Sequence, residues 1–139
     1  MPPRPYLPVG TLRFTITYPE PEDRYPDDVI REALQLFGLG AFVALLDDQA
    51  QWHVRLSVAE QQRLSFVRVL VKAPDWLFLD EATSALDEAM EAHAYATIRD
   101  RFPGTTLLSI AHRPSVATLH GRRWLLVPGD DDVGLVIVD

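Results

Sequence analysis

The chain has 139 residues, a net charge of -7, 47% hydrophobic residues and no cysteine. This length suits one domain with its own core, and the acidic balance argues against nucleic acid as the main partner, because phosphate backbones require clustered cations. The composition also excludes disulfides and thiolate metal sites, no apolar run approaches the roughly 20 residues of a membrane span, and the opening "MPPRPYLP" has no secretory h-region.

The first 26 residues are rich in proline and are expected to form mostly loops. Within them "TLRFTITY" (residues 11–18) is β-branched and alternating, which predicts a strand. The next segment, "DDVIREALQLFGLG" (27–40), has apolar residues at helical spacing and predicts a helix that Gly38 and Gly40 end. "AFVALL" (41–46) predicts a second short helix, and "DDQAQWHVR" a polar loop.

A longer helix is expected to begin after Leu56. Ser57 and Glu60 have the spacing of a capping box, in which the hydroxyl and the carboxylate each accept a hydrogen bond from a free backbone N–H. An apolar stripe follows, formed by Leu64, Val67, Leu70 and Val71. Pro74 ends the helix.

After Pro74 the chain alternates between strand and helix patterns. The predicted strands are "WLFLD", "TTLLSIAH", "RRWLLV" and "VGLVIVD", and the predicted helices are "DEAMEAHAYATIRDRF" and "RPSVATLH". The apolar run "WLFLD" is expected to be buried on both faces of a parallel α/β sheet. Ligands in such sheets bind beyond the carboxyl ends of the strands, so Asp80, Glu81 and His112 are expected to share one edge.

Each of these features also has a purely structural interpretation. Asp80 could cap the next turn while Glu81 is solvated, or the pair could hold Mg²⁺ and polarise a water molecule. A lone histidine such as His112 is more often structural than catalytic. The four histidines lack the spacing of a helical metal motif, and Ser57 with Glu60 is sufficiently explained as a helix cap.

Taken together, the motifs resemble the ATP-binding cassette of ABC transporters over nearly the whole chain. "LSVAEQQR" lies where the family has its "LSGGEQQR" signature, "LFLDEATSALD" matches the Walker B motif and D-loop, and "SIAHR" matches the H-loop. "RPYLPVGTLR" is similar to the segment after the Q-loop glutamine. This segment and "EQQRLSFVR" most resemble the bacterial and peroxisomal group with a fused permease, of the fatty-acid or peptide transporter type.

The resemblance implies a partial P-loop NTPase domain of the α/β class. A post-Q-loop segment (1–25) and a helical subdomain with the signature helix (26–73) would precede the C-terminal half of a mainly parallel sheet (74–139). It also implies ATP and Mg²⁺ as cofactors. The expected partners are a permease and a second cassette or a second copy of the chain, with a location on the cytoplasmic side of the inner or plasma membrane, held there by the permease.

The resemblance also implies a role for each matched residue. Glu81 would be the general base, and His112 would contact the γ-phosphate. Asp80 would order Mg²⁺ through water. The residues expected to contact nucleotide, directly or across the interface with a partner cassette, are Ser57, Val58, Ala59, Glu60, Asp80, Ser84 and Asp87.

The sequence departs from the family pattern at several points. It contains no "GxxxxGK[ST]" phosphate loop, and its single lysine, Lys72, has no glycine loop ahead of it. Pro3 stands where the family has the Q-loop glutamine, and Val58 and Ala59 replace the paired glycines that let backbone approach phosphate. The first half of the nucleotide-binding core is therefore expected to be missing, which leaves apolar sheet surface exposed.

Three functions are compatible with the sequence. The chain could be the C-terminal portion of an ABC transporter ATPase that another chain completes. It could be a degenerate, non-hydrolytic cassette that regulates a permease or an intact cassette, or a truncated product without function. In each case we expect no MgATP hydrolysis by the chain alone, and either marginal stability or burial of the exposed sheet face by association.

Overall fold

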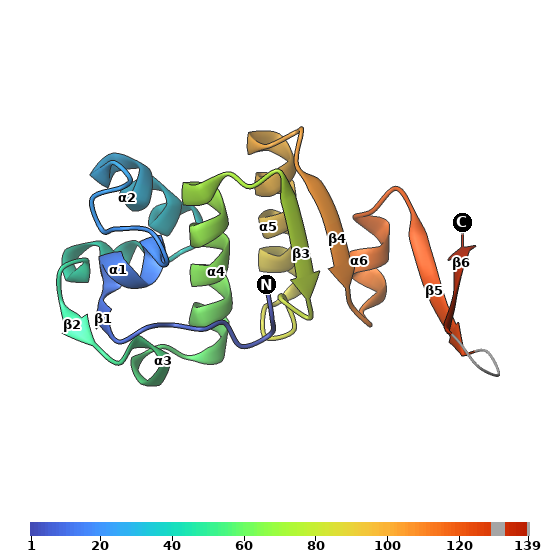
Figure 1. Cartoon of the computed structure of the whole chain (residues 1–139), viewed down its shortest axis with the longest axis horizontal. Helices are drawn as coiled ribbons and strands as arrows, with labels where there is room; N and C mark the ends of the chain where they lie inside the picture. Colours follow the sequence, from blue (N-terminus) through green and yellow to red (C-terminus); the bar gives the residue numbers. More distant parts are fainter. Residues whose placement is uncertain (129–132, 139) are drawn as a thin grey trace.

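The computed structural model describes residues 1–128 and 133–138. Short helices occupy one end of the molecule, a pair of parallel strands with α5 lies in the middle, and a β-hairpin extends from the other end (Figure 1). The helices of the first part are α1 (Leu12–Thr17), α2 (Asp27–Leu36), the 3₁₀ helix η1 (Gly40–Leu45), α3 (Trp52–Arg55) and α4 (Val58–Lys72). Two short strands, β1 (Gly10–Thr11) and β2 (Gln49–Ala50), pair antiparallel and connect the start of α1 to the segment before α3.

The strand predicted for residues 11–18 is wrong, because Leu12–Thr17 form α1. Thr11 caps this helix by accepting a hydrogen bond from the N–H of Phe14 at 2.9 Å. Leu12, Thr15 and Ile16 have helical spacing and are buried. Packing of this face against the neighbouring helices outweighs the β-propensity of the sequence.

The helix of residues 27–40 is confirmed as α2, and Gly38 follows it with a φ of 65°. Residues 41–46 are helical as expected, in the form of the 3₁₀ helix η1. The prediction of a polar loop after them is wrong in part, because this segment contains β2 and α3. Trp52 is fully buried there, and its indole N–H donates to the carbonyl oxygen of Gly10 at 3.0 Å.

The predicted capped helix is confirmed as α4, which starts after Ser57 and ends at Lys72. Its core-facing side includes Leu64, Phe66 and Val67, all of which are buried. The ring of Phe66 stacks on Phe37 of the α2 end, with centroids 5.6 Å apart. These α4 residues belong to one buried cluster that also contains Leu77 and Leu79 of the second half.

The second half contains β3 (Trp76–Asp80), α5 (Glu88–Arg101), β4 (Thr106–Ile110) and α6 (Pro114–Thr118). β3 and β4 pair in parallel through the α5 crossover, as predicted. The expectation that the third strand extends this sheet is wrong for the described residues. β5 (Arg123–Pro128) pairs antiparallel with β6 (Val133–Val138) in a separate two-stranded sheet.

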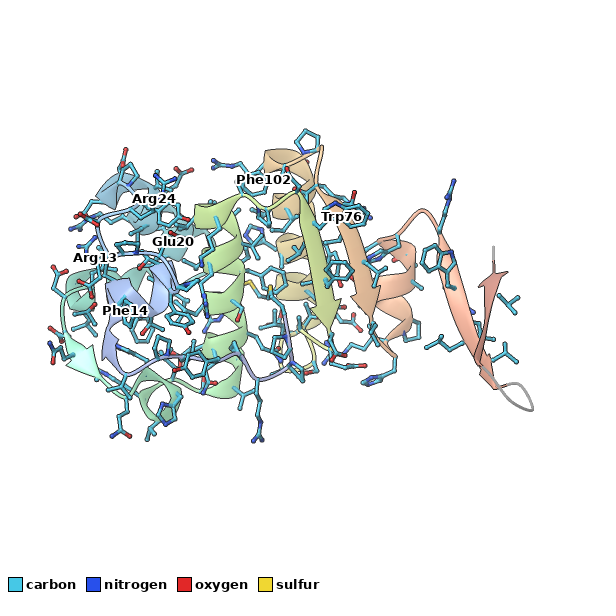
Figure 2. All side chains as sticks on the ribbon, in the orientation of Figure 1. Arg13, Phe14, Glu20, Arg24, Trp76 and Phe102 are labelled. Atoms are coloured by element: carbon cyan, nitrogen blue, oxygen red, sulfur yellow. The ribbon has the colours of Figure 1, made fainter. Side chains whose placement is uncertain are left out.

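The two faces of β3 differ in burial. Leu77 and Leu79 are 6% and 2% exposed and belong to the same buried cluster as Ile98 of α5. Trp76, labelled in Figure 2, and Phe78 are 61% and 55% exposed. Their rings stack on the open face with centroids 6.2 Å apart. The prediction that "WLFLD" is buried on both faces is therefore wrong, whereas the predicted exposure of apolar sheet surface is confirmed.

Within residues 1–128, no helix combines the length and the hydrophobicity of a membrane-crossing segment.

Candidate functional site

The carboxyl ends of β3 and β4 bring Glu81 and His112 together. The Nδ1 atom of His112 lies 2.8 Å from Oε1 of Glu81. The backbone N–H of Glu81 donates to the carbonyl oxygen of Ile110 at 2.9 Å, which continues the pairing of the two strands by one residue. The sequence-based expectation that these two residues share an edge is confirmed.

Glu81 adopts an unusual backbone conformation for this contact. Its φ is 48°, in the left-handed region that residues with a Cβ rarely occupy. Such a conformation costs on the order of 1 kcal/mol and is most often retained at functional sites. The turn directs the chain away from β3 immediately after Asp80, whose side chain is exposed at the same edge.

The loop that follows Glu81 leads into α5. Asp87 caps this helix by accepting a hydrogen bond from the N–H of Met90 at 2.7 Å. Ser84 is exposed, and its hydroxyl oxygen lies 3.1 Å from the side-chain amide nitrogen of Gln62 on α4. Asp87 is thus occupied in capping, while Ser84 lies at the surface next to the α4 side chain.

The start of α4 is closed by its own capping box. The hydroxyl and the backbone N–H of Ser57 both donate to Oε2 of Glu60, at 2.7 and 2.8 Å, and the N–H of Glu60 donates back to Ser57 Oγ at 3.3 Å. These hydrogen bonds hold the pKa of Glu60 below its ordinary value. A phosphate that reached Ser57 would have to displace this carboxylate.

Val58 lies beside this cap and is 44% exposed, so its side chain occupies the surface where the family has a glycine. Among the described residues, no hydrogen bond or ion pair joins the start of α4 to the edge formed by Asp80, Glu81 and His112. The structure therefore places the predicted residues in two groups. Ser57–Glu60 form one group, and the strand-end residues with the loop after them form the other.

Three polar side chains that bind the loop were not predicted from the sequence, and two of them are buried. Gln62 and Glu91 are each 1% exposed, and Arg113 directly follows His112. A detectable signal was present for two of them. Gln62 lies at helical spacing from the buried residues Phe66 and Val69, and Glu91 lies at the same spacing from Ala94, Tyr95 and Ile98.

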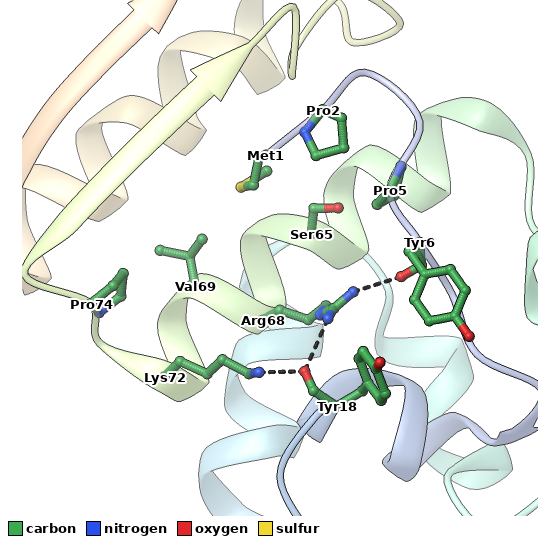
Figure 3. A pocket seen from close by; sticks show the side chains of 10 residues that line it. All are labelled: Met1, Pro2, Pro5, Tyr6, Tyr18, Ser65, Arg68, Val69, Lys72 and Pro74. Atoms are coloured by element: carbon green, nitrogen blue, oxygen red, sulfur yellow. Dashed lines mark hydrogen bonds between the residues drawn. The ribbon is translucent and has the colours of Figure 1, made fainter.

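A pocket of about 360 Å³ lies between α4 and the N-terminal segment, lined by proline and tyrosine side chains with two cations (Figure 3). Arg68 donates to the carbonyl oxygens of Tyr6 and Tyr18 at 2.9 and 3.0 Å, and the ammonium of Lys72 also donates to Tyr18. Burial and the neighbouring Arg68 lower the pKa of Lys72. Within the part of the chain that the structure describes, neither cation forms an ion pair with a carboxylate.

The parallel strands ending in Asp80-Glu81 and His112, with a capped helix before them, define part of an α/β ATP-binding domain of the P-loop class. No family model matches the chain. Two proteins of Haemophilus influenzae, each described as an uncharacterized ABC transporter ATP-binding protein, are 38% and 36% identical to it over 88% of its length. The lysosomal cobalamin transporter ABCD4 of Mus musculus is 39% identical over 91%.

Among solved structures, a bacterial Atm1-family ABC exporter with ATP bound covers 90% of the chain with a TM-score of 0.71 and 30% sequence identity. The chain is therefore homologous to the ATP-binding domains of ABC transporters and has the fold of part of one. It spans only about a fifth of the length of these relatives, between 20% and 22%.

Proposed function

We propose that the chain is the portion of an ABC transporter ATPase that carries the signature helix, Walker B residues, D-loop and H-loop. The proximity of Glu81 and His112 at the ends of two parallel strands is the observation that carries this proposal. A carboxylate and an imidazole at this edge can act on the same phosphate group and its attacking water. Coupling of the hydrolysis to transport would follow through a permease.

The proposed chemistry divides among three side chains. Glu81 accepts a proton from the attacking water, and His112 holds the γ-phosphate by a hydrogen bond. Asp80 would hold Mg²⁺ through water, and the ion would neutralise charge on the phosphates. The described residues contain no group of three ligands that would hold a metal alone, which fits an ion held largely by phosphate oxygens and water.

The open face of β3 supports the further proposal that the chain is inactive alone. A parallel strand pair normally has both faces covered, yet Trp76 and Phe78 are exposed. We propose that residues 1–25, 26–73 and 74–139 correspond to the post-Q-loop segment, the helical subdomain and half of the sheet core, and that a second segment provides the phosphate loop. Ser57, Val58, Ala59, Glu60, Ser84 and Asp87 would then face nucleotide or a partner cassette.

The proposed assembly includes a permease and a second cassette or a second copy of the chain. It would lie on the cytoplasmic side of a membrane and be held there by the permease. The purified chain at micromolar concentration with MgATP is the direct test. We expect no phosphate release above a protein-free control, and release that disappears in Glu81→Gln would contradict the proposed incompleteness.

A non-hydrolytic regulatory role is the second candidate function. A truncated product without function is the third, and the same three observations favour both: Pro3 replaces the Q-loop glutamine, Val58 and Ala59 replace the signature glycines, and Glu60 occupies the Ser57 hydroxyl. A regulatory chain would bind a permease or an intact cassette without turnover. The first two candidates differ in whether the chain supports hydrolysis once the remaining segments are supplied.

A further inference from the structure

The loop from Thr83 to Leu86 is held by side chains from three other parts of the fold. Its hydroxyl, N–H and carbonyl groups are bound by Gln62 of α4, Glu91 of α5 and Arg113, which follows β4. The roles proposed above for Ser84 and Asp87 require this loop to lie in one position. None of the three side chains has been assigned a role so far.

Gln62 uses both ends of its amide. Its Nε2 donates to Ser84 Oγ and to the carbonyl oxygen of Pro3, each at 3.1 Å, while its Oε1 accepts from the N–H of Ala85 at 2.9 Å. The side chain is 1% exposed, so water cannot replace these bonds without opening the packing. One buried amide thus connects α4, the segment at Pro3 and the loop.

Arg113 binds carbonyl groups of the same loop. Its guanidinium donates to the carbonyl oxygen of Leu86 at 2.8 Å and to that of Ser84 at 2.7 Å. A guanidinium can reach both carbonyl groups at once because its N–H donors form a rigid planar fork. Arg113 directly follows His112 in the chain, so the contact with the loop is covalently connected to the residue that carries the imidazole.

Glu91 completes the arrangement. Its carboxylate accepts from the hydroxyls of Thr83 at 2.6 Å and Ser115 at 2.7 Å, and it lies 3.6 Å from the Arg113 guanidinium. Glu91 is 1% exposed, and a buried carboxylate without hydrogen-bond partners would destabilise the fold. Glu91 therefore fixes Arg113 between the loop and the start of α6.

We infer that Gln62 and Arg113 are positioning residues, which together hold the Ser84 loop at a fixed distance from His112. Gln62 links the loop to α4 and to the segment at Pro3, and Arg113 links it to the H-loop. Displacement of the loop by a partner would therefore also displace α4, the segment at Pro3 and the H-loop. The relevance of this link to catalysis rests on the function proposed above, but the link itself can be measured without nucleotide.

The test is amide hydrogen exchange and ¹H–¹⁵N NMR of the purified full chain. Gln62→Met keeps the side-chain length and removes the amide, whereas Gln62→Glu keeps the acceptor for the Ala85 N–H and loses the donor to Pro3. Gln61→Met is the matched control, because the Gln61 amide binds the carbonyl oxygens of His53 and Leu56 instead. Arg113→Lys provides a second variant, which keeps the positive charge but loses the planar fork of donors that reaches Ser84 and Leu86.

We expect Gln62→Met to lower the protection of the Ala85 N–H by about two- to tenfold, as the loss of one hydrogen bond predicts. Gln62→Glu retains this protection, and Gln61→Met leaves it unchanged. Gln62→Met and Arg113→Lys both shift the imidazole resonances of His112, and Gln61→Met does not. If the role of Gln62 were confined to α4, Gln62→Met would change neither the protection of the Ala85 N–H nor the His112 resonances.

Unchanged Ala85 protection in Gln62→Met, or unchanged His112 resonances in both Gln62→Met and Arg113→Lys, would overturn the inference. If Gln62→Met does not fold, Arg113→Lys decides the inference by the His112 resonances, and unchanged resonances in that variant would overturn it. A loop that responds as expected, in a chain that supports no hydrolysis even when the remaining segments are supplied, would overturn the proposed function and leave this inference intact.

Discussion

His112 and Glu81 are 31 positions apart in the sequence, and His112 Nδ1 lies 2.8 Å from Glu81 Oε1 because β3 and β4 pair in parallel. Glu81 reaches this position with a φ of 48°. The side chain of His112 is 77% exposed, so the contact is open to solvent. An exposed pair of this kind contributes little to folding, and the strained backbone of Glu81 opposes folding.

Glu81→Gly is therefore expected to stabilise the chain by up to about 0.5 kcal/mol, because the relief of roughly 1 kcal/mol of backbone strain is largely offset by the added backbone entropy of the unfolded chain. Glu81→Gln keeps the Cβ and is the matched control, for which we expect a change within about 0.5 kcal/mol. Urea unfolding of the three proteins measures the difference. A glycine variant that is less stable than Glu81→Gln would show that the backbone at this position is not strained.

Substitutions at adjacent residues of β3 should differ strongly in their effect on the free energy of unfolding. Leu79→Ala is expected to cost about 2–5 kcal/mol, because the side chain is buried in the cluster between β3 and α5. Phe78→Ser should change the stability of the monomer little, since Phe78 is exposed on the open face. Denaturant unfolding followed by circular dichroism compares the two variants.

The open face of β3 should also cause association. We expect the wild-type chain to self-associate with rising concentration in analytical ultracentrifugation, or to unfold with low cooperativity, and Phe78→Ser to lower the association. A wild-type chain that stays monomeric and melts cooperatively would contradict this expectation. Tyr6→Ser is a suitable control, because Tyr6 is equally exposed but lies away from β3, at the pocket beside α4.

The capping box of α4 should make stability depend on pH. The folded chain lowers the pKa of Glu60 from its ordinary 4.5, chiefly through the hydrogen bond from Ser57. A lowered carboxyl pKa gives stability that is present above pH 4.5 and is lost as the pH falls through the folded pKa. Glu60→Ala should therefore cost about 1 kcal/mol at pH 7 and less at pH 3.

Denaturant titrations at the two pH values measure this difference. Glu88→Ala removes a carboxylate from the first turn of α5 without a comparable cap and serves as the control. A cost of Glu60→Ala that is the same at both pH values would show that the ionised carboxylate does not stabilise the start of α4.

Lys72 is the only lysine of the chain, so its titration can be followed without overlap from other lysines. Burial and the charge of Arg68 lower its pKa from the ordinary 10.5. The unfolded chain then binds more protons between the two pKa values, and the free energy of unfolding rises with pH across that window. We expect the ¹³Cε resonance of Lys72 to titrate at lower pH in the folded chain than in urea.

Equal midpoints in the two states would mean that the ammonium is fully hydrated and does not lie in the pocket beside Tyr18. The urea-unfolded chain is an internal control, because it contains the same residue in the same sequence.

The sequence predicted the elements whose signals are local. The Ser57–Glu60 spacing and Pro74 predicted α4 closely, and the apolar run before Asp80 predicted β3. The contact between Glu81 and His112 followed from the general rule that the carboxyl ends of parallel strands share an edge. These features depend on short stretches of chain and on one topological rule.

The remaining features depend on contacts between distant segments. The β-branched run at residues 11–18 became α1 because its helical face packs into the core, and Trp52 is buried because Gly10 lies beside it. The interactions of Gln62 with Pro3 and Ala85 also required three segments to be placed relative to one another. Propensity and spacing do not carry this information.

The most direct test of the account is a chimera. This chain would replace the matching segment of the bacterial Atm1-family exporter, and the rest of that exporter would complete the proposed site. The measurement is MgATP hydrolysis by the purified chimera, with Glu81→Gln in the inserted segment and the parent exporter as controls. We predict turnover that is slower than in the parent, because Pro3, Val58 and Ala59 are retained, and that is lost in Glu81→Gln. A folded chimera that binds ATP without turnover, or turnover that survives Glu81→Gln, would contradict the account.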